Sequence, residues 1–265
     1  MGFQQKKEYN IDDLLAIMEL LRSPGGCPWD REQTHGSIRK NFIEETYEVA
    51  EAIDNGDTAL LREELGDVLL QVVFHTEIER EQGSFTFDDV CDGVCKKLIL
   101  RHPHIFSDVI ADTPEEVLSN WEDIKKQEKR QTTQTQVLQS VPRTLPALMR
   151  SEKVQHRAAK VGFDYPGVQG ALSDLRSEVD ELSEAIRCGS PEDIAGELGD
   201  VLFSAANVAR HCKLDSEQAL GRSCDKFVSR FAGVEQLATQ RRIDMTQADI
   251  KTLDSLWQEV KNKDM

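Results

Sequence analysis

The hexapeptide Glu-Leu-Gly-Asp-Val-Leu occurs twice in this chain, at Glu64–Leu69 and again at Glu197–Leu202. A pair of glutamates precedes each copy at the same distance, so the whole acidic pattern recurs 133 positions downstream (178 − 45 = 133). A duplicated, metal-binding helical hairpin explains this regularity better than chance does. The carboxylates of the pattern, which are the predicted metal ligands, are Glu45, Glu48, Glu64 and Asp67 in the first half and Glu178, Glu181, Glu197 and Asp200 in the second half.

Hydrophobic residues around the first hexapeptide have the spacing of a helix. Leu65, Val68, Leu69, Val72 and Val73 follow the i, i+3, i+4, i+7, i+8 pattern of a buried helical face. Similar periodicity extends along most of the chain and strand-like alternation is scarce, so the sequence predicts an all-α protein. Helices are predicted near residues 11–22, 37–54, 58–82, 87–100, 114–130, 145–160, 170–187, 191–211, 215–240 and 247–262.

The duplication predicts two domains. At 265 residues the chain is long enough for two domains of ordinary size. A polar, uncharged run at 131–136 separates the two acidic patterns. We therefore expect two tandem helical-bundle repeats, residues 1–130 and 141–265, joined by a linker at 131–140.

Charge and cysteine content limit the expected partners and compartment. The formal net charge of −16 repels a phosphate backbone, which argues against nucleic-acid binding and means that a phosphorylated ligand needs a cation. The six cysteines include no Cys-x-x-Cys pair, and the sequence shows neither a signal peptide nor an apolar run long enough to span a membrane. We expect a cytoplasmic protein with reduced thiols and no membrane partner.

The acidic residues have the spacing of a metal site. Each glutamate pair, and each Glu-x-x-Asp of the hexapeptides, places two carboxylates on one face of a predicted helix, and a short connection folds the two helices back antiparallel. Two carboxylates about 4 Å apart repel each other by roughly 4 kcal/mol at an effective dielectric constant of about 20, so four in one cavity require a cation. Oxygen ligands without paired histidine or cysteine favour Mg²⁺ or Mn²⁺. A ferritin-like di-iron centre requires paired Glu-x-x-His motifs, and Glu32–His35 is unpaired.

Basic and aromatic residues are duplicated as well, at slightly different offsets. A Lys-x-x-x-Arg pair in each half could hold terminal phosphates, although one such pair alone is more often a solubilising surface. A tryptophan in each half could stack on a base, although tryptophans near a helix end are more often core residues. The substrate-binding candidates are Lys97, Arg101 and Trp121 in the first half and Lys226, Arg230 and Trp257 in the second half.

The expected nucleophile is water. The sequence has no phosphate-binding Gly-Lys-Ser/Thr loop and no Gly-x-Ser-x-Gly turn, which favours a water activated by the metal. Glu44 and Glu63 are candidates to accept its proton. Glu45 and Glu178 complete the set of catalytic candidates.

These motifs resemble those of a known enzyme family. The pattern Glu44-Glu45-x-x-Glu48 followed by Glu64-x-x-Asp67 resembles the signature of the all-α nucleoside triphosphate pyrophosphatases. Further segments make almost the whole chain similar to the long, two-domain members of the MazG family. The resemblance implies a Mg²⁺-dependent homodimer that cleaves nucleoside triphosphates between the α and β phosphates into a nucleoside monophosphate and pyrophosphate, and so clears unwanted nucleotides or adjusts nucleotide pools. The further segments are Cys27-Pro28-Trp29-Asp30-x-Glu32-Gln33-Thr34, Arg101-His102-Pro103-His104 and Pro142-Arg143-x-Leu145-Pro146-Ala147-Leu148.

The second half departs from the family pattern at two positions. Ser177 stands where the first glutamate of the signature is expected, and Gly196 stands where Glu63 would recur. The four carboxylates remain, so metal binding is predicted in both halves, while the division of turnover between the halves stays open. Two other functions also stay open: a non-catalytic helical scaffold that binds a nucleotide or a protein partner, and a hydrolase of another phosphorylated metabolite, such as one resembling phosphoribosyl-ATP.

Overall fold

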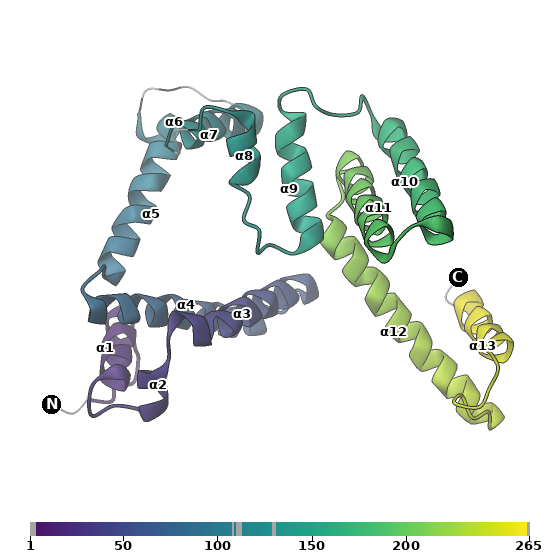
Figure 1. The fold of residues 1–265 in the computed structure, drawn as a ribbon. Coiled ribbons are helices and arrows are strands. Elements are labelled where there is room, and N and C mark those ends of the chain that lie inside the picture. Colours follow the sequence, from purple (N-terminus) through teal and green to yellow (C-terminus); the bar gives the residue numbers. More distant parts are fainter. Residues whose placement is uncertain (1–3, 108, 110–112, 129–130, 264–265) are drawn as a thin grey trace. The chain divides into compact units, whose positions relative to one another are not determined.

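The computed structural model of this chain describes residues 4–107, 109, 113–128 and 131–263. Helices and the turns that connect them account for the described residues, with no strand among them, so the all-α prediction is confirmed. Contacts between residues divide the chain into two compact units, which we call unit 1 (Met1–Lys125) and unit 2 (Lys126–Met265). Figure 1 follows the helices along the chain from purple to yellow.

Unit 1 is built on a hairpin of two long helices, α3 and α4. Gly56 ends α3 with a φ of +66°, in the left-handed region that favours glycine, and Asp57 begins α4 by accepting hydrogen bonds from the backbone amides of Ala59 and Leu60. This tight turn folds α4 back along α3, and α1 packs against α4. The helices of the unit are α1 (Ile11–Arg22), α2 (Pro28–Glu32), α3 (His35–Asn55), α4 (Thr58–Gln82), α5 (Phe87–Arg101), α6 (Pro103–Phe106) and α7 (Pro114–Glu128), the last of which runs past the unit boundary.

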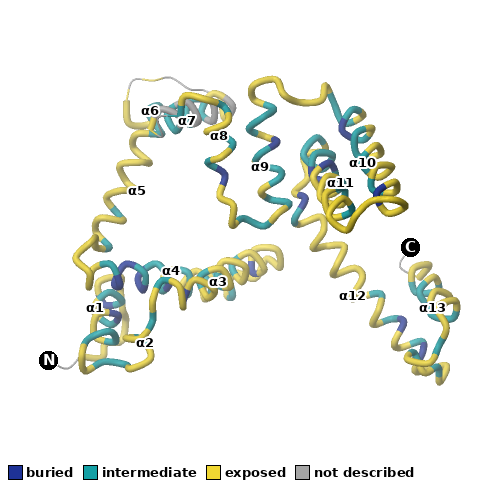
Figure 2. The backbone as a smooth tube through the Cα atoms, viewed as in Figure 1, coloured by how far each residue is buried: buried dark blue, intermediate teal, exposed yellow. Residues whose placement is uncertain are grey.

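Large apolar side chains fill the interior between α1, α3 and α4. Met18, Ile38, Val73, Phe74 and Ile78 are each no more than 5% exposed and form one cluster, which lies in the dark blue segments of Figure 2. Burial of a side chain of this size contributes about 1.5–3 kcal/mol relative to leaving it in water. The cluster therefore holds the hairpin against α1.

Unit 2 contains a second hairpin, α10 and α11. Ser190 begins α11 with a capping box, in which its hydroxyl accepts from the Asp193 backbone amide and the Asp193 carboxylate accepts from the Ser190 amide, and Pro191 occupies the first helical position. A cluster of Val234, Ala238 and Leu256 joins α12 to α13. The helices of the unit are α8 (Gln134–Gln139), α9 (Ala147–Ala159), α10 (Val168–Cys188), α11 (Pro191–His211), α12 (Ser216–Arg241) and α13 (Ile250–Lys263).

The predicted linker contains a helix that the sequence analysis did not predict. Part of the segment 131–140 is helical, because Thr133 and Gln136 form a reciprocal capping box that begins α8 within this polar run. The short helices α2 and α6, each begun by a proline, were not predicted either. Among the helices that the structure describes, none combines the length and apolar character needed to cross a membrane.

Candidate metal centres

The hairpin of unit 1 brings carboxylates of α3 and α4 together. Glu45 and Glu48 lie one turn apart on α3 and Glu64 faces them from α4, so that one oxygen atom of each carboxylate lies within 4.8 Å of the other two. Asp67 follows Glu64 by one turn, and its charge raises the pKa of both Glu45 and Glu64. All four predicted ligands of unit 1 therefore influence one small region.

The hairpin of unit 2 repeats this arrangement with a different third ligand. Glu178 of α10 and Glu197 and Asp200 of α11 place one carboxylate oxygen each within 4.8 Å of the others. Glu181 lies outside this group of three, but its charge raises the pKa of Glu178. Its carboxylate accepts a 3.2 Å hydrogen bond from the hydroxyl of Ser177. The residue that departs from the family signature thus contacts the fourth predicted ligand.

Both groups contain carboxylates whose pKa lies above the ordinary value of 4.5. Burial is the largest cause for Glu45, Glu64 and Glu178, and the charges of the neighbouring acidic residues add to it. Because burial and like charge both disfavour the ionised form, an ionised group of this kind needs positive charge beside it. A set of oxygen donors without histidine or cysteine fits a hard divalent cation such as Mg²⁺ or Mn²⁺.

Each of the two predicted proton acceptors of unit 1 directly precedes a member of its carboxylate group in the chain. Glu44 is exposed and forms an ion pair with Lys40, one turn earlier on α3, at 2.9 Å. Glu63 is also exposed, and its charge contributes to the raised pKa of Glu64. Both carboxylates are accessible to water, as a proton acceptor must be.

The tryptophan of unit 1, Trp121, has two cations close to its ring. The guanidinium carbon of Arg101 lies 5.1 Å from the centre of the Trp121 ring, and Lys125 Nζ lies 4.6 Å from the same ring. Cations above an aromatic face are attracted by its quadrupole. Lys97 is exposed on α5, one turn before Arg101. Two predicted substrate-binding residues, Arg101 and Trp121, are therefore adjacent, and in this structure they contact each other.

The tryptophan of unit 2 belongs to the apolar core between α12 and α13. Trp257 packs against the cluster around Leu256, and its ring centre lies 5.2 Å from that of Phe227. On α12, Lys226 is exposed and Arg230 is half-buried. The contacts of Trp257 are therefore those of a core residue near a helix end.

A cavity of about 690 Å³ adjoins the carboxylates of unit 2, and sequence analysis did not identify it. Glu178 and Asp200 form part of its wall, together with Gln155, Asn207 and Arg210 from α9 and α11. Ligand pockets commonly have about 300–1,000 Å³, so the volume suits a small organic molecule. A comparison of the two halves position by position would have revealed Gln155 and Asn207, because Met18 and Phe74 stand at the corresponding positions of unit 1.

Comparisons with known proteins agree with the repeated hairpin. The family model for the MazG nucleotide pyrophosphohydrolase domain matches residues 33–106 and 168–234, which include α3–α4 and α10–α11. The nucleoside triphosphate pyrophosphohydrolase of Escherichia coli (strain K12) is 43% identical over 96% of this chain and 98% of its own length. The nucleoside triphosphate pyrophosphohydrolase/pyrophosphatase MazG of Thermotoga maritima is 42% identical over 96% of each chain. The uncharacterized protein YabN of Bacillus subtilis is 44% identical over 93% of this chain but 50% of its own length.

Proposed function

This chain belongs to the MazG nucleotide pyrophosphohydrolase family and is a nucleoside triphosphate pyrophosphohydrolase, and we propose how its residues carry out that hydrolysis. The reaction adds water across the anhydride between the α and β phosphates and yields a nucleoside monophosphate and pyrophosphate. The observation that supports a hydrolytic role for both hairpins is the pair of carboxylate groups, each with three oxygens within 4.8 Å.

The carboxylates are the proposed ligands of Mg²⁺. In unit 1 these are Glu45, Glu48, Glu64 and Asp67. The raised pKa values of Glu45 and Glu64 are what carboxylates without a neighbouring positive charge would show. When bound, the cation would supply positive charge to the carboxylates and to the phosphates of the substrate. Mn²⁺ fits the same donor set. In unit 2 the proposed ligands are Glu178, Glu181, Glu197 and Asp200.

The proton of the attacking water passes to a glutamate. In unit 1 the proposed acceptors are Glu44 and Glu63, which are exposed beside the carboxylate group, with Glu45 as a further candidate. In unit 2 the acceptor is Glu178, because Ser177 and Gly196 carry no carboxylate.

Basic side chains hold the charge that develops on the departing pyrophosphate. The proposed phosphate-binding residues are Lys97 and Arg101 on α5 and Lys226 and Arg230 on α12. Guanidinium groups suit this role because they donate two parallel hydrogen bonds to phosphate oxygens. The two tryptophans, Trp121 and Trp257, are proposed to border the nucleotide.

We propose that the enzyme is a homodimer, because α5 and α12 expose apolar side chains. Val94 and Leu98 on α5 are 44% and 50% exposed, and Phe227 and Val228 on α12 are 56% and 66% exposed. Rows of apolar groups in contact with water are stabilised when a second surface covers them. A second copy of the chain is the proposed cover.

The six free thiols fit a reducing compartment, and we propose that the protein is cytoplasmic.

Product analysis tests the proposed reaction. The protein is incubated with Mg²⁺ and a panel of ribo- and deoxyribonucleoside triphosphates, and the products are separated by ³¹P NMR. We expect pyrophosphate and the nucleoside monophosphate, and no turnover in excess chelator. Orthophosphate as the first product, or turnover that chelator leaves unchanged, would contradict the proposal.

A further inference from the structure

The helical hairpins of units 1 and 2 correspond to each other, but the residues in the interiors of the two units differ. Met18 lies four residues before the end of α1, and Gln155 lies four residues before the end of α9; both are buried, at 2% and 7% exposure. Gln155 thus stands in unit 2 where Met18 fills the apolar core of unit 1. On the hairpins the same replacement of large apolar groups recurs at the 133-residue offset. These pairs are Ile38 and Ala171, Val73 and Ala206, Phe74 and Asn207, and Ile78 and His211.

Two of these replacements border a cavity beside the carboxylates of unit 2. The cavity of about 690 Å³ includes both Gln155 and Asn207, and its wall continues to Glu178 and Asp200. The aromatic side chain of Phe163 also lines it and is 83% exposed. A ligand in this cavity would therefore lie next to the second carboxylate group.

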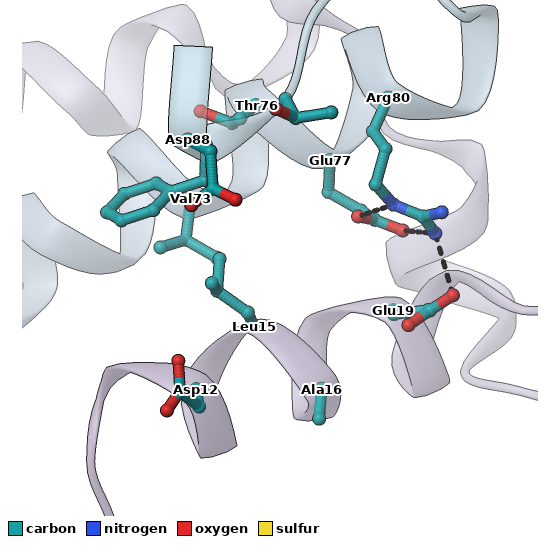
Figure 3. Close-up of a pocket in the computed structure, with 11 residues that line it drawn as sticks. Asp12, Leu15, Ala16, Glu19, Val73, Thr76, Glu77, Arg80 and Asp88 are labelled. Atoms are coloured by element: carbon teal, nitrogen blue, oxygen red, sulfur yellow. Dashed lines mark hydrogen bonds and ion pairs between the residues drawn. The ribbon is translucent and has the colours of Figure 1, made fainter. Parts of the chain in front are cut away.

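Unit 1 has a smaller cavity in a different place. It is lined by residues of α1, α4 and the start of α5 and has a volume of about 390 Å³. Figure 3 shows its lining side chains. Its basic residue, Arg80, is already paired with Glu77 at 2.7 Å and with Glu19 at 3.0 Å. None of the metal-ligand candidates of unit 1 lines this cavity. Of these two cavities, the one in unit 2 is therefore the one that borders a carboxylate group.

Gln155, which lines the cavity of unit 2, carries a buried hydrogen-bond acceptor that has no partner. Gln155 Nε2 donates a 2.8 Å hydrogen bond to the backbone carbonyl of Phe203, which fixes the orientation of the amide. Gln155 Oε1 is consequently directed away from that carbonyl, and it is buried without a hydrogen bond. A buried acceptor left unpaired is costly, so a ligand N–H group that reached this oxygen would remove that cost.

Asn207 adds a donor at the same wall. Its Oδ1 accepts hydrogen bonds of 3.1 Å and 2.7 Å from the guanidinium of Arg210, which leaves its amide nitrogen as the group it can offer. The two terminal guanidinium nitrogens of Arg210 in turn donate hydrogen bonds to the carboxylate of Asp164. An acceptor beside a donor, with an aromatic ring nearby, matches the edge and the face of a nucleobase.

We propose that this cavity receives the base of the nucleoside triphosphate, and that Gln155 Oε1 accepts a hydrogen bond from an N–H group of that base. This inference rests on the proposed function, because it takes the phosphates to lie at the carboxylates of unit 2. Gln155 is then a specificity-determining residue of the reaction. It favours substrates whose base carries an N–H donor over analogues that lack one.

The test compares substrates that differ in that donor. For the full-length enzyme, kcat/KM is measured for ATP against purine riboside triphosphate, which lacks the amino group, and for UTP against N3-methyluridine triphosphate, which lacks the N–H. ATP and UTP are compared first, and the one with the higher kcat/KM identifies the informative pair. In that pair we expect the analogue to have a kcat/KM about tenfold or more below that of the natural substrate. Equal values of kcat/KM within both pairs would overturn the inference.

The variant Gln155→Met introduces the residue that unit 1 carries at the matching position. We expect it to reduce the discrimination within that pair to about twofold or less, mainly through KM for the natural substrate, because Met has no acceptor that the base needs. The matched control is Gln71→Met, since Gln71 is also a buried glutamine with an unpaired Oε1 but does not line this cavity. Discrimination that survives in Gln155→Met, or that disappears equally in Gln71→Met, would overturn the inference. If no nucleoside triphosphate yields pyrophosphate, the proposed function itself fails, which is distinguishable from turnover without discrimination.

Discussion

At the scale of the residue, the carboxylates set the chemistry of the molecule. Glu45, Glu64 and Glu178 have raised pKa values, first because they are partly buried and then because other carboxylates surround them. The spacing of these residues was evident from the sequence, since two carboxylates three positions apart share one helical face. The unpaired oxygen of Gln155 was not, because it depends on the carbonyl of Phe203, 48 residues later in the chain.

Replacement of one carboxylate should stabilise the cation-free protein. A group whose folded pKa is raised contributes stability below about pH 4.5 that is lost as the pH rises through the raised value, so ionised Glu45 is destabilising near pH 7.5. We expect Glu45→Gln to raise Tm by roughly 1–3 °C in chelator, and to reduce the further rise that Mg²⁺ produces in the wild type. Glu51→Gln, at an exposed position of the same helix outside the carboxylate group, is the control and should change neither value. A fall in the Tm of Glu45→Gln in chelator would contradict this account.

Cation affinity should depend on pH with a definite sign. Protons must leave the carboxylates before the cation binds, and the raised pKa values move that competition above the ordinary 4.5. Calorimetric titration with Mn²⁺ at about pH 8 and about pH 5 should show weaker binding at the lower pH. Affinity that is unchanged or greater at the lower pH would show that these carboxylates are not the ligands.

At the scale of the element, the start of a helix was predictable where a side chain at its N-cap determines it. The predicted ranges 11–22, 58–82 and 191–211 agree with α1, α4 and α11 at both ends. Asn10, Asp57 and Ser190 cap these helices through side-chain oxygens. The helix α8 was missed because a polar run of low complexity suggested a linker, although Thr133 and Gln136 form a capping box within it.

Two glycines of α12 should respond to alanine in opposite ways. A Cβ atom on Gly233 would lie 2.9 Å from Cγ1 of Val260 on α13, so Gly233→Ala should force the helices apart and lower the free energy of unfolding by about 1–3 kcal/mol. A Cβ atom on Gly221 meets nothing within 4 Å, so Gly221→Ala should raise the free energy by about 0.5–1 kcal/mol through helix propensity. Urea denaturation measures both, and a stabilising Gly233→Ala would show that α13 does not pack closely on α12.

At the scale of the whole molecule, duplication explains the architecture and divergence explains its asymmetry. The twin hexapeptides predicted two helical repeats, and the family model matches both hairpins. The sequence patterns did not predict that the two interiors differ, because a change such as Phe74 to Asn207 keeps the helix and alters the space beside it. Two of these changed positions, Gln155 and Asn207, line the cavity of unit 2.

The proposed dimer predicts a specific mass in solution and a substitution that should disrupt the dimer. Sedimentation equilibrium should give twice the chain mass of 29.9 kDa. Val228→Asp places a charge on the exposed apolar face of α12 and should shift the equilibrium toward monomer by roughly tenfold or more, because a buried charge is costly. Gln240→Asp, at an exposed polar position of the same helix, should not. A monomeric wild type at micromolar concentration would contradict the proposal.

The most direct test of the central claim is pyrophosphate release by four proteins in one assay: wild type, Glu64→Ala, Glu197→Ala and the double variant. Each substitution removes a member of one carboxylate group of three. If the carboxylates hold the cation that hydrolysis requires, the double variant should lose at least about a thousandfold in kcat/KM while its circular dichroism stays helical, and the single variants should show how turnover divides between the units. A folded double variant that still releases pyrophosphate at the wild-type rate would contradict the account.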